Sequence, residues 1–140
     1  MSLSSIEVRV INISFRDIEF KLEEFEDIFY TKLFVSAPHL RSLFAEDLST
    51  QRSHMGEAFN LFAKNAENID EMGDMLKDLG GRHTEYGADE DLYPIVCSSM
   101  VEALSEVVGS SWTQEAHEAW SHFLEILSQY MIEGTRLKLK

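Results

Sequence analysis

Apolar residues recur at intervals of three and four along nearly the whole chain, which is the period of an amphipathic helix. Two successive apolar stripes predict the first two helices. The first stripe consists of Ile11, Phe15, Ile18 and Leu22, and the second, which runs toward Pro38, of Leu22, Phe25, Phe29 and Leu33. Proline disfavours a helical conformation in the residue before it, so we expect the chain to turn at Ala37. Ser4 followed by Glu7 predicts a capping box at the start of the first helix.

The rest of the chain continues this pattern in four further stripes. Their members are Met55, Ala58, Phe59, Phe62, Ala66 and Ile69; Met72, Leu76, Leu79 and His83; Val96, Met100, Ala103, Leu104, Val107 and Val108; and Ala116, Ala119, Trp120, Phe123, Leu127 and Met131. Pro94 suits the first turn of the fifth helix, Gly109 its end, and Thr113 the cap of the last helix. No stretch alternates with period two between hairpin turns, so we predict an all-α fold of six or seven helices.

One of these stripes ends in a polar residue, His83, in the run LGGRHTEYG. Helical spacing places its imidazole on the buried face of the helix. A buried histidine either forms a hydrogen bond to a backbone carbonyl in the core or binds a metal. Both interpretations are open from this residue alone.

Length and charge narrow the class of protein. A chain of 140 residues is expected to form one domain, residues 1–140. Twelve basic and 25 acidic side chains give a formal charge of −13, which disfavours nucleic acid and anionic membrane surfaces as partners. With Cys97 as the only cysteine, an internal disulfide or a thiolate metal cluster is excluded. We see no signal-peptide pattern and no apolar run that approaches membrane-spanning length, so we expect a cytoplasmic protein.

Six segments of the sequence resemble a bacterial globin, most closely the single-domain globins akin to the haem domain of flavohaemoglobins. In order they are FYTKLF, PHLRSLF, DLSTQRSHM, LGGRHTEYG, DLYPIV and SWTQEAHEAWSHF. Any one segment would be weak, but their order and separations make the resemblance specific, and it extends from about Phe15 to Met131. It implies a globin fold of three helices over three that grips haem b between the third long helix and the helix bearing His83.

On the proximal side, the resemblance assigns His83 as the iron ligand and Tyr93 as a tyrosine beside it. In flavohaemoglobins a glutamate joins that tyrosine, and the two increase the electron donation of the imidazole. The position expected for the glutamate falls on Thr135, while Glu133 lies two residues earlier, about 200° around the helix. Either Glu133 substitutes for it, or this chain lacks the tuning.

On the distal side, the resemblance assigns Tyr30 and Gln51 as hydrogen-bond donors to a bound gas. Phe44 matches the aromatic ring that stacks on the porphyrin, and Met55 shares a helix face with Gln51 and supplies apolar bulk. His54 fits the rim, where it pairs with a haem propionate; the alternative is a six-coordinate haem with His54 as second axial ligand. From its sequence position alone, Gln51 is equally a solvated residue in a first helical turn.

Three functions follow from the resemblance. The first is a haem-binding globin that reversibly binds dioxygen, nitric oxide or carbon monoxide at a five-coordinate iron. A tyrosine and glutamine pair predicts slow release of dioxygen, which points away from bulk transport. The second is a nitric oxide dioxygenase served by a separate reductase, since the 140 residues include no flavin or nicotinamide domain. The third is a globin-type gas sensor.

Overall fold

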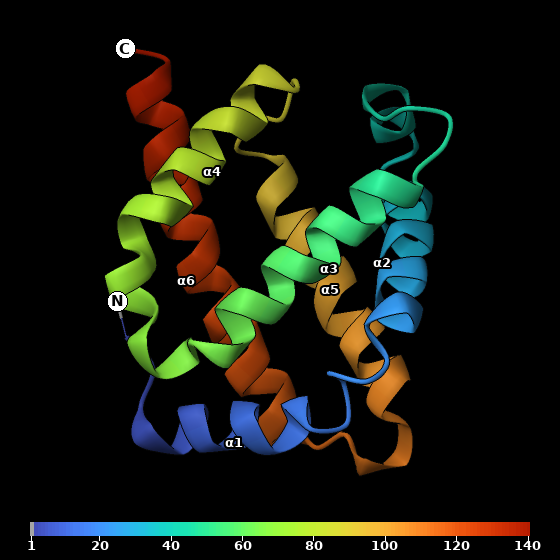
Figure 1. Cartoon of the computed structure of the whole chain (residues 1–140), viewed down its shortest axis with the longest axis vertical. Helices are drawn as coiled ribbons and strands as arrows, with labels where there is room; N and C mark the ends of the chain where they lie inside the picture. The colour runs from blue at the N-terminus through green and yellow to red at the C-terminus, as the bar shows by residue number, and fades with distance from the viewer. Residues whose placement is uncertain (1) are drawn as a thin grey trace.

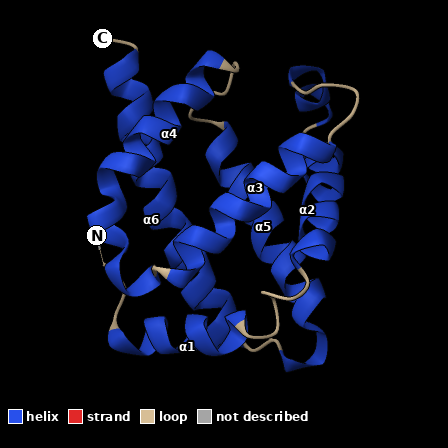
Figure 2. Ribbon diagram, in the orientation of Figure 1, coloured by secondary structure: helices blue, strands red, loops and turns tan. Residues whose placement is uncertain are grey.

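The computed structural model describes residues 2–140, which form six α-helices and three short 3-10 helices (Figure 1). The α-helices are α1 (Ser5–Phe15), α2 (Leu22–Ser36), α3 (Ser49–Lys64), α4 (Gly73–Glu85), α5 (Leu92–Val108) and α6 (Gln114–Lys138). The 3-10 helices are η1 (Pro38–Leu43), η2 (Ala66–Met72) and η3 (Gly109–Ser111). Residues 2–140 contain no strand, and the prediction of an all-α fold is confirmed (Figure 2).

The helix ends follow the predicted capping chemistry. At the start of α1 the Glu7 amide donates to Ser4 Oγ at 3.1 Å, and the Ser4 amide donates to Glu7 Oε1 at 2.8 Å. Thr113 Oγ1 accepts a hydrogen bond from the Ala116 amide at 3.0 Å at the start of α6. Gly109 follows α5 with a φ of 73°, a conformation that glycine adopts without steric cost. These features fix where the long helices begin and end.

Three predicted helices are shorter than their stripes. Met72, predicted to begin the stripe of the helix that carries His83, lies in η2 before α4. α1 ends at Phe15, and Ile18 is buried from the turn that follows it. α3 ends at Lys64, because Asn65 leaves the helical conformation and its side chain donates to the Leu61 carbonyl at 2.8 Å. The expectation that Ala66 and Ile69 continue the third helix is therefore wrong: both lie in η2. Both remain buried, since residues three apart share a face of a 3-10 helix.

The helices form two layers. α3 and α4 cross in front of α5 and α6, and α1 runs across the end of the molecule (Figure 1). The extensive packing interfaces join α4 to α6, α2 to α5 and α3, and α6 to α1 and α5. α1, α3 and α4 thus pack over α2, α5 and α6, the predicted three-over-three arrangement.

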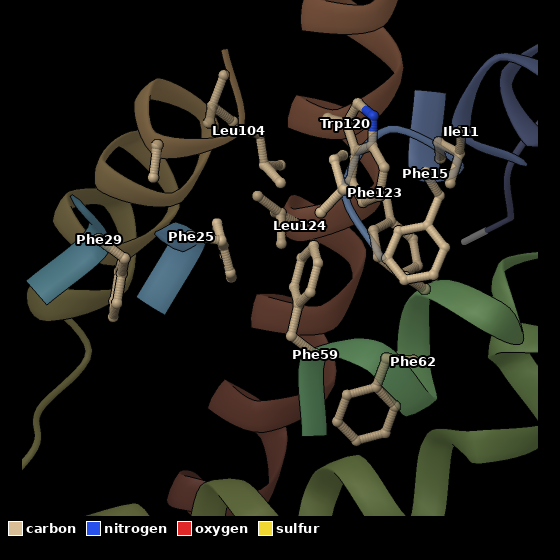
Figure 3. Packing of buried hydrophobic residues seen from close by; sticks show 14 of the residues in the cluster. Ile11, Phe15, Phe25, Phe29, Phe59, Phe62, Leu104, Trp120, Phe123 and Leu124 are labelled. Carbon is tan, nitrogen blue, oxygen red and sulfur yellow. The ribbon is translucent and has the colours of Figure 1, made fainter. Parts of the chain in front are cut away.

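Aromatic rings fill the core between these layers (Figure 3). Phe25, Trp120 and Phe123 are completely buried. The Phe59 ring lies 4.5 Å from Phe25 and 5.7 Å from Trp120, measured between ring centroids. The indole N–H of Trp120 donates to Ser14 Oγ at 2.8 Å, so its one polar atom is satisfied. The core therefore ties α1, α2, α3 and α6 together.

α5 is the most apolar of the helices. Among the described residues, the segment Leu92–Ser111 is long and apolar enough to span a membrane, with a mean hydropathy of 1.2. By that measure, the expectation that no apolar run approaches membrane-spanning length is wrong. Length and composition are weak evidence, however, because a core helix meets the same criteria. α5 contributes Val101, Ala103, Leu104 and Val107 to the core between α2 and α6.

The closest backbone approach in the fold is the crossing of α4 and α6. A Cβ placed on Gly80 would overlap the backbone carbonyl of Met131, and a Cβ on Gly134 would overlap that of Lys77. Glycine in a helix interior costs about 0.5–1 kcal/mol relative to alanine, so its use at both positions indicates that the close crossing outweighs that cost. His83 lies on α4 less than one turn after this crossing.

We predict opposite effects for alanine at the two adjacent glycines of α4. Gly80→Ala should destabilise the protein by roughly 1–3 kcal/mol, because α4 and α6 must separate to admit the methyl group. Gly81→Ala is the matched control: its Cβ would meet no atom closer than 3.7 Å, so stability should hold or rise by up to about 1 kcal/mol. Thermal and urea unfolding of both variants measure the difference. Equal effects at the two positions would contradict the close crossing.

Candidate functional site

His83 lies in the last turn of α4, and its side chain is partly buried. Its Nδ1 lies 2.8 Å from the Leu79 carbonyl oxygen. Because a carbonyl only accepts, Nδ1 carries the proton and Nε2 keeps a free lone pair. Burial lowers the pKa of His83, and the Leu79 carbonyl opposes that shift only in part, so the ring is neutral near pH 7. The two interpretations of this histidine are thus compatible: it is satisfied by a core carbonyl and still presents a nitrogen that could bind a metal.

Two buried hydroxyl groups lie on α5 and α6. Tyr93, in the first turn of α5, is 8% exposed, and its hydroxyl is the one buried side-chain polar atom among the described residues that lacks a hydrogen-bond partner. Burial raises the pKa of Tyr93, while the Thr135 side chain opposes this shift and so lies close to the phenol. Thr135 on α6 is 2% exposed and donates from Oγ1 to the Gly80 carbonyl at 3.2 Å. Threonine therefore fills the buried position between Tyr93 and α4.

Glu133 does not take that position. Its carboxylate lies 3.5 Å from the Lys77 ammonium group, and its side chain is 47% exposed. It lies two positions before Thr135 in the sequence, which turns it to another face of α6. The alternative in which Glu133 substitutes for a buried glutamate beside Tyr93 is contradicted by this geometry.

On the other side of the fold, Tyr30 on α2 is 5% exposed among aromatic rings. Its ring centroid lies 4.9 Å from that of Phe29 and 5.8 Å from that of Phe44. Burial raises the pKa of Tyr30 to about 12, and a hydrogen-bonding interaction with the Gln51 side chain opposes the rise. Tyr30 is therefore a protonated donor at any ordinary pH, with Gln51 as its polar neighbour.

The predicted distal residues differ in exposure. Gln51 and His54 are exposed in the first two turns of α3, and Met55 is half-buried against the core. Phe44, half-buried, follows η1 in an extended conformation. The structure thus brings Gln51 to Tyr30, although Gln51 is also in contact with solvent, and leaves His54 at the surface of α3.

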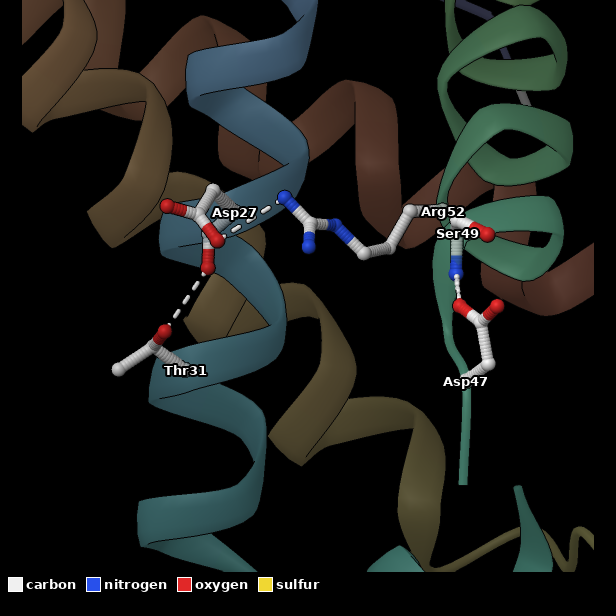
Figure 4. Close-up of polar contacts among 5 residues, drawn as sticks. All are labelled: Asp27, Thr31, Asp47, Ser49 and Arg52. Carbon is white, nitrogen blue, oxygen red and sulfur yellow. Dashed lines mark hydrogen bonds and ion pairs between the residues drawn. The ribbon is translucent and has the colours of Figure 1, made fainter. Parts of the chain in front are cut away.

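Polar contacts hold α3 to α2 beside these residues (Figure 4). Arg52 Nη2 lies 2.9 Å from the Asp27 carboxylate, and the Ser49 amide donates to Asp47 Oδ1 at 3.0 Å near the start of α3. Glu26 fills the space beside Gly56, where a Cβ would overlap its carboxylate. Burial raises the pKa of Glu26, although Arg52 opposes the shift. These contacts fix the start of α3 over α2, and with it the position of Gln51.

The donor set decides what the site could hold. Residues 2–140 contain no group of three His, Cys, Asp or Glu side chains able to bind a metal ion. His83 supplies a single neutral nitrogen beside the carbonyl of the apolar Leu79, and across the fold Phe44 and Met55 are partly buried against the hydrophobic core. Two surface hollows, along α1 and in the turn before α2, include none of these residues. One nitrogen in apolar surroundings fits a metal held mainly by a large organic ring, as in haem, better than a bare ion.

Three features of this site were not found from the sequence. The Leu79 carbonyl that orients His83, the half-buried Glu26 under Gly56 and the contacts of Arg41 with the chain after η1 all depend on tertiary geometry. The adjacent glycines Gly80 and Gly81 could have predicted a close helix crossing from the sequence, because glycine inside a helical pattern often marks a site of close packing.

Comparisons with known proteins agree with this fold. The chain is 29% identical over 96 residues to a flavohemoprotein of Rhizobium meliloti, covering 66% of the chain and 24% of the relative. It is 24% identical over 133 residues to leghemoglobin-1 of Lupinus luteus, covering 85% of the chain and 86% of the relative. A bacterial globin from Campylobacter jejuni superposes with a TM-score of 0.85 at 20% identity, covering 98% of this chain and all of that one.

The extent of these matches differs. The chain spans about a quarter to a third of the length of the flavohemoproteins that it matches. The family profile described as Globin matches residues 27–131, well over half of the chain and the whole stretch from α2 into α6. The chain therefore belongs to the globin family.

Proposed function

We propose that this globin binds haem b through His83 and reversibly binds dioxygen or another diatomic gas. The observation that carries the proposal is the neutral His83, whose Nδ1 is committed to the Leu79 carbonyl at 2.8 Å and whose Nε2 is free. Relatives named as flavohemoproteins and leghemoglobins support haem as the cofactor. The five-coordinate state is favoured because His54, the competing ligand, lies on the exposed face of α3.

Different residues of this chain would bind the haem and the gas. Ferrous haem supplies an iron centre with affinity for small diatomic gases. His83 would hold the iron, Phe44 and Met55 would give the porphyrin apolar contact, and the exposed His54 would pair with a propionate. Tyr30, kept protonated by its raised pKa, donates a hydrogen bond to a polar ligand, and Gln51 supplies a second donor.

The proximal side favours binding over oxygen activation. A carboxylate beside the proximal tyrosine would increase electron donation by the imidazole. Here that position holds Thr135, whose hydroxyl donates to the Gly80 carbonyl, and Glu133 faces Lys77 instead. The partner of His83 Nδ1 is therefore a neutral carbonyl, and no described carboxylate reinforces it.

A nitric oxide dioxygenase is the second candidate. Its support is the similarity to flavohemoproteins, although the chain spans about a quarter to a third of their length. Tyr30 and Gln51 are the residues that would hold dioxygen in that reaction, and a separate reductase would have to supply electrons. A gas sensor on the same fold is the third candidate and has no specific observation in its favour.

The first test is replacement of His83 by glycine. His83→Gly should abolish stable haem retention, because the only nitrogen donor of the site is removed. Addition of free imidazole should restore a Soret band, since the cavity left by the side chain admits it. Absorption spectra of the ferric, ferrous and carbon monoxide-bound forms measure the effect.

His54→Ala is the matched control for this variant. The exposed His54 should leave the five-coordinate ferrous spectrum unchanged. A normal spectrum in His83→Gly without imidazole would contradict the assignment of His83. A six-coordinate ferrous spectrum in the wild type that disappears in His54→Ala would instead establish two histidine ligands.

The second test concerns Tyr30. Tyr30→Phe should speed dioxygen release by about fivefold or more, because it removes a hydrogen bond worth about 1 kcal/mol. Carbon monoxide is a weaker acceptor, so its release should change less. Stopped-flow or flash-photolysis rates for both gases make the measurement, with Tyr130→Phe as control, since the Tyr130 hydroxyl donates to Asp70 at the surface.

The raised pKa of Tyr30 leads to a prediction about the effect of pH on dioxygen release. The pKa of Tyr30 is raised from 10.0 to about 12, so the phenol stays a donor as the pH rises. Dioxygen release by the wild type should therefore be constant between about pH 8 and about pH 10, above the usual range of histidine titration. An acceleration centred near pH 10 would show that the phenol is exposed to solvent rather than in the pocket.

The third test separates a gas-binding protein from a dioxygenase. We expect the dioxygen-loaded protein to oxidise nitric oxide once, in stoichiometric amount, and to turn over slowly when a flavin reductase is added. Thr135→Glu, which restores a carboxylate beside Tyr93, should raise the iron–histidine stretching frequency in the ferrous protein. Thr135→Val serves as control. Rapid turnover by the wild type would favour the dioxygenase.

A further inference from the structure

Arg41, in the last turn of η1, binds three consecutive backbone carbonyls that follow it. Its Nη1 donates to the carbonyl oxygens of Ala45 at 2.9 Å and of Phe44 at 3.4 Å, and its Nη2 donates to that of Glu46 at 2.8 Å. The Phe44 amide in turn donates to the Arg41 carbonyl at 3.2 Å. The chain after η1 is thus folded around one guanidinium group.

These contacts require arginine. A guanidinium offers five donors in a rigid planar fork, whereas an ammonium group offers three from a single point. The chain has 25 acidic side chains, yet among the ion pairs of residues 2–140 none includes Arg41. The charge of Arg41 is directed at backbone that has no helix or sheet to satisfy it.

The same guanidinium lies over the Phe34 ring, which belongs to an aromatic trio. Its carbon lies 5.6 Å from the centroid of the Phe34 ring. The Phe34 ring lies 5.4 Å from Phe44 and 5.9 Å from Tyr30, and the Phe44 and Tyr30 rings lie 5.8 Å apart. Each ring of Phe34, Phe44 and Tyr30 therefore contacts the other two, and Arg41 contacts the trio through Phe34.

We infer that Arg41 is a positioning residue: it fixes Phe44 where the ring can stack on haem and, through the aromatic trio, sets the direction of the Tyr30 phenol. The inference rests on the proposed function. Phe44 is half-buried in extended backbone between η1 and α3, so no helix holds its side chain in place. The bonds to the carbonyls of Phe44, Ala45 and Glu46 replace that missing constraint.

The test compares Arg41→Ala and Arg41→Lys with the wild type and with Arg9→Ala. Arg9 is exposed on α1 and forms no ion pair among the described residues, so it controls for loss of charge. Arg41→Ala should speed dioxygen release by about fivefold, because Tyr30 loses its alignment, and should also speed haem loss to an apoprotein acceptor. Release of carbon monoxide should change by less than twofold. Arg41→Lys should rescue little, since it keeps the charge and loses the fork.

If Arg41 had only a structural role, Arg41→Ala would change the release rates of dioxygen and carbon monoxide by the same factor. Equal acceleration of dioxygen and carbon monoxide release, or wild-type rates of dioxygen release and haem loss, would overturn the inference. Full rescue by lysine would overturn the requirement for a fork. If Arg41→Ala fails to fold, Phe34→Leu, which removes the ring under the guanidinium, should show the same selectivity for dioxygen, and its absence counts against the proposal.

The apoprotein distinguishes failure of this inference from failure of the proposed function. Hydrogen exchange of the Phe44 amide should be faster in Arg41→Ala than in the wild type, with or without haem. A wild type that retains no haem would end the proposed function, while this exchange difference would still report whether Arg41 holds the segment. A haem-bound wild type with unchanged Phe44 exchange in the variant would overturn the inference alone.

Discussion

The close crossing of α4 and α6 is the constraint on which the site depends. Gly80 and Gly134 let the two backbones meet without intervening side chains, and Thr135 then donates to the Gly80 carbonyl. His83 follows within one turn, so its direction is set by a rigid helix pair rather than by a loop. A histidine placed in this way loses little conformational entropy on binding a ligand, because packing has already fixed its ring.

The surroundings of Tyr30 and Gln51 are held in place by different contacts. α2 carries Phe25, Phe29 and Tyr30 on neighbouring faces, so the aromatic core and the buried phenol are parts of the same helix. Burial of the phenol raises its pKa, which keeps the proton on the oxygen where a donor is needed. Gln51 is held near it by the start of α3, which the Arg52 to Asp27 ion pair fastens to α2. Exposed ion pairs contribute little to stability, so this one acts by placement.

The sequence predicted the helices well because their apolar period, caps and glycine end are local features. The prediction from the sequence failed where tertiary contacts determine the end of a helix. Asn65 ends α3 early, and Ala66 and Ile69 lie in a 3-10 helix that keeps the same buried face. The site residues were placed through resemblance, since His83 by spacing alone was ambiguous. The Leu79 carbonyl, the Arg41 contacts and the direction of Glu133 could not be predicted, because each depends on which face of a helix meets its neighbour.

The position of Thr135 has the widest consequence for chemistry. A buried glutamate at this point would need a partner for its charge, and its desolvation would be costly without one. Threonine avoids that cost by donating to a helix carbonyl, and it leaves the Tyr93 hydroxyl without an acceptor. His83 is then oriented by one neutral carbonyl at 2.8 Å. If His83 holds a haem iron as we propose, an imidazole so oriented is a weaker electron donor than one paired with a carboxylate, which supports our proposal of reversible gas binding.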